Sequence, residues 1–187
     1  MSQLRRKAMT PEEFLAWEAG QGLKWEIAGF EPVAMTGGTD AHAAIQVNTI
    51  VALGGRLRGR PCYVRGAETK VQIGPGYRYP DAFVSCASVA RDATVAADPV
   101  VIFEVVFEST GRTDRTVRLA KYRALSSVQR YVMPEQGQVV ATAFTRVETG
   151  WVLERLDASG VLSMPEIGEE VAIAELYDGL DLALPES

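Results

Sequence analysis

Four polar side chains lie in or beside apolar stretches of the sequence. Asp81 precedes the strand-like run AFVSC, Glu104 lies in the middle of PVVIFEVVFEST (99–110), and Glu26 and His42 come earlier in the chain. Burying an ionised carboxylate costs on the order of several kcal/mol unless a cation or a hydrogen-bond donor meets it. Two acids on neighbouring strands would form an oxygen cage of the kind that holds Mg²⁺ together with water and substrate phosphate. We therefore interpret Asp81 and Glu104 as candidate metal ligands.

Each of these residues also has an ordinary structural interpretation. Asp81 follows Pro80, and aspartate after proline is typical of a turn. Glu26 is compatible with the solvent-facing side of an edge strand. His42, the single histidine of the chain, falls in the first turn of a predicted helix, where a structural hydrogen bond is as reasonable as catalysis. Taken singly, the four residues leave these alternatives open.

Basic residues gather in two further regions. A helix predicted from Thr113 and Asp114 to about Ala124 carries Arg118 and Lys121, which lie three residues apart and so on one side of it. This is either a solvated face or, if the helix packs beside the Glu104 strand, a source of positive charge for a phosphate. The second region is either a phosphate-tracking patch or ordinary surface. It comprises Arg56, Arg58, Arg60, Arg65, Lys70 and Arg78.

Composition sets the class of protein. The 187 residues, 47% hydrophobic and 23% charged, predict one soluble domain over 1–187, with 1–9 as a flexible N-terminal segment. A formal charge of −5 disfavours nucleic-acid binding by overall charge, so any such binding needs a local patch. No export signal or membrane span is visible, and we expect a cytoplasmic protein. Cys62 and Cys86 lack metal-site spacing and are expected to be two buried thiols rather than a disulfide.

The order of elements favours a mixed α/β (α+β) fold around one sheet. Helices are predicted after the N-cap Thr10 and over 41–58, where Gly59 follows, and the last segment, VAIAELYDGL, suggests one short helix. Strands are predicted on both sides of Ala28-Gly29, in CYVRG, TKVQIG, YPDAFVSC and 99–110, and in the C-terminal β-meander of RYVMP, VVATAFTRV and WVLERL.

Several separated motifs together resemble the Uma-two family of proposed restriction endonucleases, within the PD-(D/E)xK nuclease superfamily. They occur in the family's order, from Thr10 to Leu180: TPEEFLAWE, WEIAGFEPVAMTGGTDAHAAIQVN, YPDAFVSC, VIFEVVFESTGRTDR, KYRALSSVQRYVM and EIGEEVAIAELYDGL. The resemblance implies a restriction-endonuclease-like fold, with a central mixed β-sheet flanked by helices. It also implies a metal-activated water that attacks a DNA phosphodiester in line.

Site roles follow from the resemblance residue by residue. It implies that Asp81 is the aspartate of the "PD" motif and that Glu104 is the acid of the "ExK" motif, the two together binding Mg²⁺ or Mn²⁺. Glu26 matches the family's upstream acid, a further ligand or an orienting group. His42 matches the histidine after the family's Gly-Gly turn.

The sequence departs from the family where a lysine is expected. The third "ExK" position is Val106, and the lysine of the family's following helix is replaced by Arg118 in DRTVRLAKY. Arginine keeps the positive charge but does not release a proton near neutral pH. Lys121, one turn later, is the alternative basic group. The family's "SPST" also reads FEST here, with Phe107 and Glu108 in place of serine and proline.

The leading hypothesis is a metal-dependent endonuclease that hydrolyses phosphodiester bonds in DNA. Its site would comprise Asp81, Glu104, Glu26, His42, and Arg118 or Lys121. The alternative is a catalytically impaired protein of the same fold that acts as a nucleic-acid-binding module or as a dimeric scaffold. A homodimer is expected for double-strand cleavage, because breaking two strands requires two sites.

Overall fold

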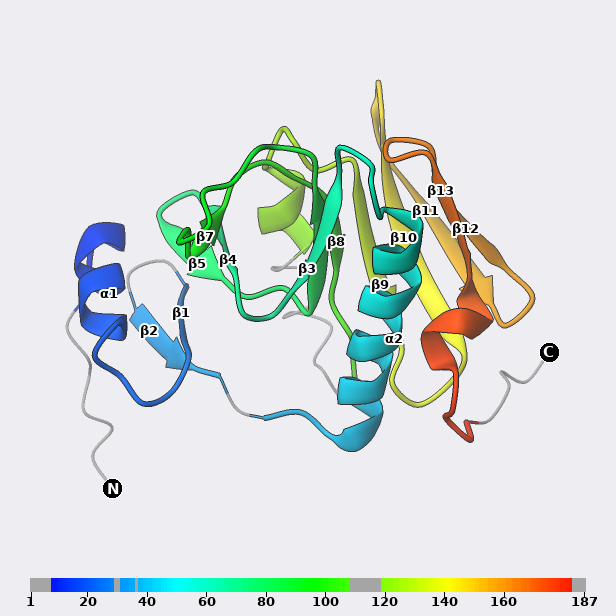
Figure 1. Cartoon of the computed structure of the whole chain (residues 1–187), viewed down its shortest axis with the longest axis horizontal. Helices are drawn as coiled ribbons and strands as arrows, with labels where there is room; N and C mark the ends of the chain where they lie inside the picture. Colours follow the sequence, from blue (N-terminus) through cyan, green and yellow to red (C-terminus); the bar gives the residue numbers. More distant parts are fainter. Residues whose placement is uncertain (1–7, 29–30, 36, 108–118, 183–187) are drawn as a thin grey trace.

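A computed structural model of the chain describes residues 8–28, 31–35, 37–107 and 119–182 (Figure 1). The sequence-predicted Arg118 and the start of its helix lie outside the described residues, whereas residues 119–123 are helical. None of the helices in these ranges has the length and apolar character needed to cross a bilayer.

Both predicted N-terminal helices are present and begin at capped residues. Helix α1 (Pro11–Glu18) starts after Thr10, whose hydroxyl accepts the Glu13 N–H while the Glu13 carboxylate accepts the Thr10 N–H. This reciprocal pair is a capping box. Helix α2 (Asp40–Arg56) starts after Thr39, whose hydroxyl accepts the His42 N–H at 3.3 Å. The Thr39 cap therefore places His42 in the first turn of α2, as predicted.

A five-stranded sheet in the order β2-β1-β5-β4-β7 takes all its strands from the first hundred residues of the chain. Its strands are β1 (Trp25–Ala28), β2 (Glu31–Ala34), β4 (Lys70–Ile73), β5 (Gly76–Arg78) and β7 (Val95–Ala96). Figure 1 shows α1 beside β1 and β2 at one end of the molecule. After β5 the chain passes through residues 79–81 into β6 of the second sheet, so Asp81 lies at the crossing between the two sheets.

A six-stranded sheet in the order β11-β10-β9-β8-β6-β3 forms the centre. Its strands are β3 (Tyr63–Gly66), β6 (Ala82–Ser85), β8 (Pro99–Phe103), β9 (Arg130–Pro134), β10 (Val140–Val147) and β11 (Gly150–Asp157). Strands β8 and β9 run parallel and the other pairs antiparallel, so the sheet is mixed. Strands β9, β10 and β11 form the predicted C-terminal meander.

The central strands are buried on both faces. Alternate side chains of β6 point to opposite faces, so Ala82 and Val84 join the core under α2, whereas Phe83 packs with Ile102 and Tyr131 on the other face. Helix α2 also packs against the C-terminal 3₁₀ helix η1 (Ile173–Tyr177), beside the hairpin of β12 (Val161–Met164) and β13 (Glu169–Ala172) (Figure 1).

Three predictions about elements were wrong. Strand β8 ends at Phe103, so Glu104 lies just past the strand rather than at its centre. VAIAELYDGL is not one helix, because Val171 and Ala172 pair with β12 before η1 begins. The two cysteines form a disulfide, since the register Tyr63↔Ser85 of β3 and β6 places Cys62 opposite Cys86.

Candidate functional site

Asp81 and Glu104 lie beside each other at the ends of β6 and β8. The last antiparallel pair of these strands is Ala82↔Phe103, so Asp81 directly precedes one member of this pair and Glu104 directly follows the other. Like charges placed so close to each other on neighbouring strands repel. The structure therefore brings together the two acids that the sequence singled out, in an arrangement that requires compensating donors.

The carboxylate of Asp81 ends the ladder between β6 and β8. Its Oδ2 atom accepts the backbone N–H of Val105 at 2.7 Å, in the place where a strand would offer a carbonyl. Pro80 precedes it and has no N–H to offer to a neighbouring strand. This capping contact explains why the regular pairing stops before Glu104.

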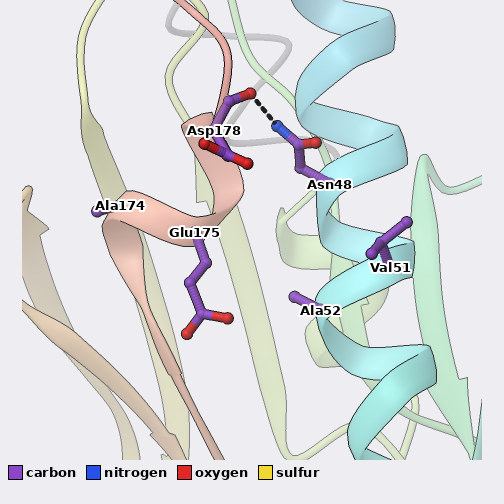
Figure 2. A pocket seen from close by; sticks show the side chains of 6 residues that line it. All are labelled: Asn48, Val51, Ala52, Ala174, Glu175 and Asp178. Atoms are coloured by element: carbon purple, nitrogen blue, oxygen red, sulfur yellow. Dashed lines mark hydrogen bonds between the residues drawn. The ribbon is translucent and has the colours of Figure 1, made fainter.

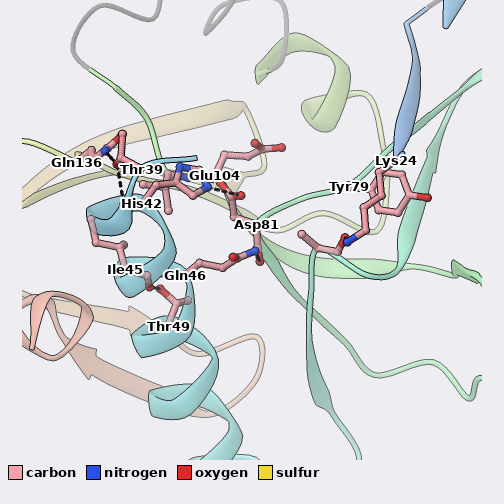
Figure 3. A network of polar contacts seen from close by, with 12 residues as sticks. Lys24, Thr39, His42, Ile45, Gln46, Thr49, Tyr79, Asp81, Glu104 and Gln136 are labelled. Carbon is pink, nitrogen blue, oxygen red and sulfur yellow. Dashed lines mark hydrogen bonds and ion pairs between the residues drawn. The ribbon is translucent and has the colours of Figure 1, made fainter. Parts of the chain in front are cut away.

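His42, in the first turn of α2, contacts the second carboxylate oxygen of Asp81 (Figure 3). The distance from His42 Nε2 to Asp81 Oδ1 is 2.9 Å, and the Asp81 side chain is only 13% exposed. The hydrogen bond to Asp81 raises the pKa of His42, burial lowers it, and the charges of Asp81 and Glu104 raise it further. One turn later on α2, the amide of Gln46 donates to the backbone carbonyl of Asp81 at 2.9 Å. Asp81 is thus held through three of its oxygen atoms.

Glu104 is buried, with 5% of its surface exposed. The hydroxyl of Tyr122 donates to Glu104 Oε1 at 2.6 Å, and the Tyr122 ring stacks on Tyr131 with 5.3 Å between the ring centroids. Burial raises the pKa of Tyr122 well above its usual value of 10.0, and the charge of Glu104 raises it further. Tyr122 is therefore a protonated donor near neutral pH. This hydrogen bond from Tyr122 explains how the buried Glu104 carboxylate is tolerated directly after an apolar strand.

Glu26 has a different environment from the one expected of an edge strand. It is buried on β1, which lies between β2 and β5, so the solvent-facing alternative was wrong. Glu26 Oε2 accepts from Arg78 Nη1 at 2.8 Å, and Oε1 accepts from the Tyr79 N–H at 3.1 Å. Both oxygens thus contact the segment that leads into Asp81, which suits an orienting role.

Lys121 lies on the helical residues 119–123 and lines a cavity of about 240 Å³ with Arg78, Ile27 and the turn 74–76. Its neighbour Tyr122 is the residue that contacts Glu104. The predicted role of Lys121 at the carboxylates stays a prediction, and that of Arg118 falls outside the described residues.

Three supporting residues were not predicted as parts of the site. Tyr122 carries the terminal position of the DRTVRLAKY motif, and Gln46 lies four residues after His42, on the same face of α2. These two spacings could have indicated them. Gln136, whose amide donates to the Thr39 hydroxyl at the start of α2, comes from a distant turn and gives no such signal (Figure 3).

The donor set fits a hard divalent cation. Carboxylate oxygens are the ligands that Mg²⁺ and Mn²⁺ prefer, and a cation would relieve the repulsion between Asp81 and Glu104. Among the residues described, no group of three or more His, Cys, Asp or Glu side chains is placed to hold a metal. The protein would therefore supply the two carboxylates, and water and substrate phosphate the remaining ligands, as is usual for Mg²⁺.

A separate cavity of about 390 Å³ lies between α2 and η1 (Figure 2). It is lined by Asn48, Val51, Ala52, Ala174, Glu175 and Asp178. The Asn48 amide donates to the backbone carbonyl of Asp178 at 2.9 Å and Arg56 pairs with Glu175 at 2.7 Å. These contacts tie α2 to η1, and the cavity contains none of the sequence-predicted site residues.

Comparison with known proteins identifies the family and the fold of the chain. Residues 11–176 match the model of the Uma2 family, described as "Putative restriction endonuclease". An uncharacterized protein of Synechocystis sp. (strain ATCC 27184 / PCC 6803 / Kazusa) is 29% identical over 176 residues, 92% of this chain and 93% of that protein. The crystal structure of a "putative nuclease belonging to DUF820" from Anabaena variabilis ATCC 29413 shares the fold with a TM-score of 0.75. It is 14% identical in sequence and covers 90% of this chain and 97% of its own. Because the family model spans most of the sequence, as the motifs indicated, the chain belongs to the Uma2 family.

Proposed function

We propose that this protein is a metal-dependent endonuclease that hydrolyses phosphodiester bonds in DNA. The observation that carries the proposal is the position of Asp81 and Glu104, which directly flank the last pair of β6 and β8, Ala82↔Phe103. Each carboxylate has its own hydrogen-bond donors. Asp81 is contacted by His42 and by the Val105 N–H, and Glu104 is contacted by the Tyr122 hydroxyl. Membership of a family described as restriction endonucleases and the shared fold support the same conclusion.

Asp81 and Glu104 would hold Mg²⁺ or Mn²⁺, which supplies a more acidic water and a polarised phosphate oxygen. The Val105 N–H and Gln46 fix the orientation of Asp81, while Tyr122 fixes Glu104 and remains protonated. His42, whose pKa is raised chiefly by its hydrogen bond to Asp81, contacts that carboxylate from α2. Such prepositioned donors and charges act on the transition state at no cost of reorganisation.

Arg118 or Lys121 would add positive charge for the phosphate, and Glu26 would orient the segment before Asp81 through Arg78 and the Tyr79 N–H. The arginine at position 118 favours electrostatic support over proton transfer. It also motivates the second candidate, a nucleic-acid-binding protein of this fold that no longer turns over substrate.

The test is Mn²⁺- and Mg²⁺-dependent cleavage of supercoiled plasmid and of single-stranded DNA by wild type, Asp81→Asn and Glu104→Gln. We expect wild type to cleave and both variants to lose cleavage while keeping the wild-type circular dichroism spectrum. Glu170→Gln, an equal charge change on exposed residue 170 of β13, is the matched control and should cleave like wild type. Cleavage that persists in both site variants contradicts the proposal.

Wild-type cleavage separates the two candidates, and Arg118→Lys shows whether the residue at position 118 is what impairs a protein that does not cleave. If wild type binds DNA without cleaving it and Arg118→Lys restores cleavage, the protein is an impaired nuclease. If neither protein cleaves although both bind DNA, the binding module is the correct description. Light scattering in solution tests the proposed homodimer, and a monomer at assay concentration would exclude it.

A further inference from the structure

A second polar cavity lies on the edge strand β3, apart from the carboxylate pair. It has a volume of about 350 Å³ and is bounded by β3, by the segment 89–93 and by β7. Its polar side chains are Tyr63, Arg65, Thr69 and Arg91. None of the described residues that line it is acidic. Two guanidinium groups and two hydroxyls around one cavity are typical of an anion site.

Arg65 is distinguished from most of its basic neighbours by the lack of an acidic partner. In the basic region around α2 and β3, Arg56 pairs with Glu175, Arg60 with Glu169, Lys70 with Glu18 and Arg78 with Glu26. Neither Arg65 nor Arg91 has a carboxylate partner among the described residues. On a chain with a net charge of −5, their cavity is therefore a local positive site.

Tyr63, which lines this cavity, carries an unused hydrogen-bond donor. Its hydroxyl is buried and has no hydrogen-bond partner in the described part of the chain. The Arg65 guanidinium lies over the Tyr63 ring, 4.3 Å from the centroid, which orients the arginine at the cavity. A buried hydroxyl without a partner costs stability, and such groups in native structures call for an explanation. An anion within reach of Tyr63 and the two arginines would provide one.

The cavity lies close to the candidate active site. Arg65 pairs with Phe83 on β6, two residues after Asp81, and two strand residues span about 7 Å. The disulfide of Cys62 and Cys86 joins β3 to the start of the segment that forms the opposite wall. The cavity is therefore held in a fixed position one strand away from the acid.

We propose that this cavity binds a backbone phosphate of a polynucleotide whose neighbouring phosphodiester lies at Asp81 and Glu104. The inference rests on the proposed function and specifies how an acidic protein would hold its substrate. Every nucleotide of a strand carries a phosphate, so a chain bound at the carboxylates presents further phosphates within reach of β3. A free phosphate or a mononucleotide is too small to occupy both the cavity at β3 and the position beside Asp81 and Glu104. The proposed ligand is therefore an oligonucleotide or a longer strand.

The first experiment measures binding of a short fluorescein-labelled oligothymidylate by anisotropy, in EDTA, so that cleavage plays no part. Arg65→Ala/Arg91→Ala should weaken binding roughly tenfold or more, since charge-assisted contacts are the stronger hydrogen bonds. A plot of the logarithm of the binding constant against the logarithm of the salt concentration should become less steep. Its slope should change by about 0.7 for each phosphate contact with the single strand that is removed. Arg155→Ala removes an exposed charge from β11, at the opposite edge of the same sheet, and should change neither quantity.

Tyr63→Phe isolates the hydroxyl. Because the hydroxyl has no partner, its removal should leave the free energy of unfolding unchanged or raise it, while weakening oligothymidylate binding severalfold. A merely structural tyrosine would show the reverse: lower stability and unchanged binding. That result would overturn the proposal.

Two further outcomes would also overturn it. The first is a loss of binding in Arg155→Ala as large as that caused by the Arg65 and Arg91 changes. The second is that the Arg65 and Arg91 changes abolish binding of inorganic pyrophosphate and leave oligothymidylate binding intact, which would indicate a site for a small anion. The binding result is independent of cleavage. If no DNA is cut but binding still requires Arg65 and Arg91, the phosphate site stands and the proposed nuclease activity fails.

Discussion

Asp81 is the residue through which the local backbone, helix α2 and the candidate metal site are connected. Its carboxylate accepts from the Val105 N–H on one side and contacts His42 on the other, and its own carbonyl accepts from Gln46. Sequence reasoning identified Asp81, Glu104 and His42 because polar residues in apolar surroundings are visible in a single chain. It did not identify Tyr122 as a site residue, because a tyrosine in an amphipathic helix is ordinarily a core residue.

The first residue-scale prediction concerns the pKa of His42 in the metal-free protein. The imidazole should titrate above 6.5, chiefly because of its hydrogen bond to Asp81. Asp81→Asn should lower this pKa, since it removes the charge that holds the proton. As the chain has one histidine, its imidazole proton resonance gives the titration directly. An unchanged pKa in Asp81→Asn would contradict the assigned cause.

The sign of the linked stability follows. A folded-state pKa above the unfolded value means that the folded protein binds the proton more tightly. The His42–Asp81 contact therefore contributes stability that is fully present below the unfolded pKa and is lost as pH rises through the folded pKa. Replacing His42 by Ala should remove this part of the pH dependence.

The second residue-scale prediction tests the donor to Glu104. Tyr122→Phe keeps the ring that stacks on Tyr131 but removes the hydroxyl that donates to a buried carboxylate. We expect a loss of about 1–3 kcal/mol in the free energy of unfolding, measured with urea in EDTA. Tyr63→Phe is the control, because its hydroxyl has no described partner, and it should cost nothing. Equal effects of the two changes would contradict the role of Tyr122.

At the scale of elements, local signals predicted much of the fold. The Thr10 cap, the apolar spacing of α2 and the Gly-containing turns of the C-terminal meander are encoded within a few residues, and these elements are present. The missed elements were β5, β7, β12 and β13, which are two to four residues long. Strands this short are stabilised by pairing partners from elsewhere in the chain, and periodicity does not predict them.

The buried pair of Glu18 and Lys70 was missed for the same reason. Its atoms Oε2 and Nζ are 2.7 Å apart, although the residues lie on α1 and β4. Glu18 also accepts from the Tyr79 hydroxyl at 2.6 Å. The sequence shows two ordinary charged residues, and only the fold shows that they fasten α1 to the five-stranded sheet.

An element-scale prediction concerns the close approach of β1 and β5. A Cβ atom at Gly76 would lie 2.4 Å from the backbone carbonyl oxygen of Ile27, and a backbone neighbour cannot move without shifting its strand. Gly76→Ala should therefore lower the free energy of unfolding by about 1–3 kcal/mol. Urea unfolding measures it, with Gly137→Ala as the control because a Cβ there meets nothing within 4 Å. A Gly76→Ala protein as stable as the control would show that β1 and β5 are less closely packed.

At the scale of the whole molecule, the candidate site is a place where folding and function make opposite demands. Folding brings the adjacent carboxylates of Asp81 and Glu104 together with Glu104 buried, whereas stability alone would favour apolar side chains in such a position. If the proposed metal site is correct, this cost in stability is the cost of keeping its two ligands. A ligand that binds only the folded state returns stability by mass action.

This relation gives the last prediction. Mn²⁺ should raise the free energy of unfolding of wild type, by about 2.7 kcal/mol at a hundred times its dissociation constant. Glu104→Gln keeps an acceptor for Tyr122 but removes a charged ligand, so its thermal midpoint should not respond to Mn²⁺, whereas Glu170→Gln should respond like wild type. Because the measurement needs no substrate, it tests the metal site independently of cleavage. If Mn²⁺ shifted the thermal midpoint of Glu104→Gln as much as that of wild type, the ion would bind elsewhere. Asp81 and Glu104 would then not be metal ligands.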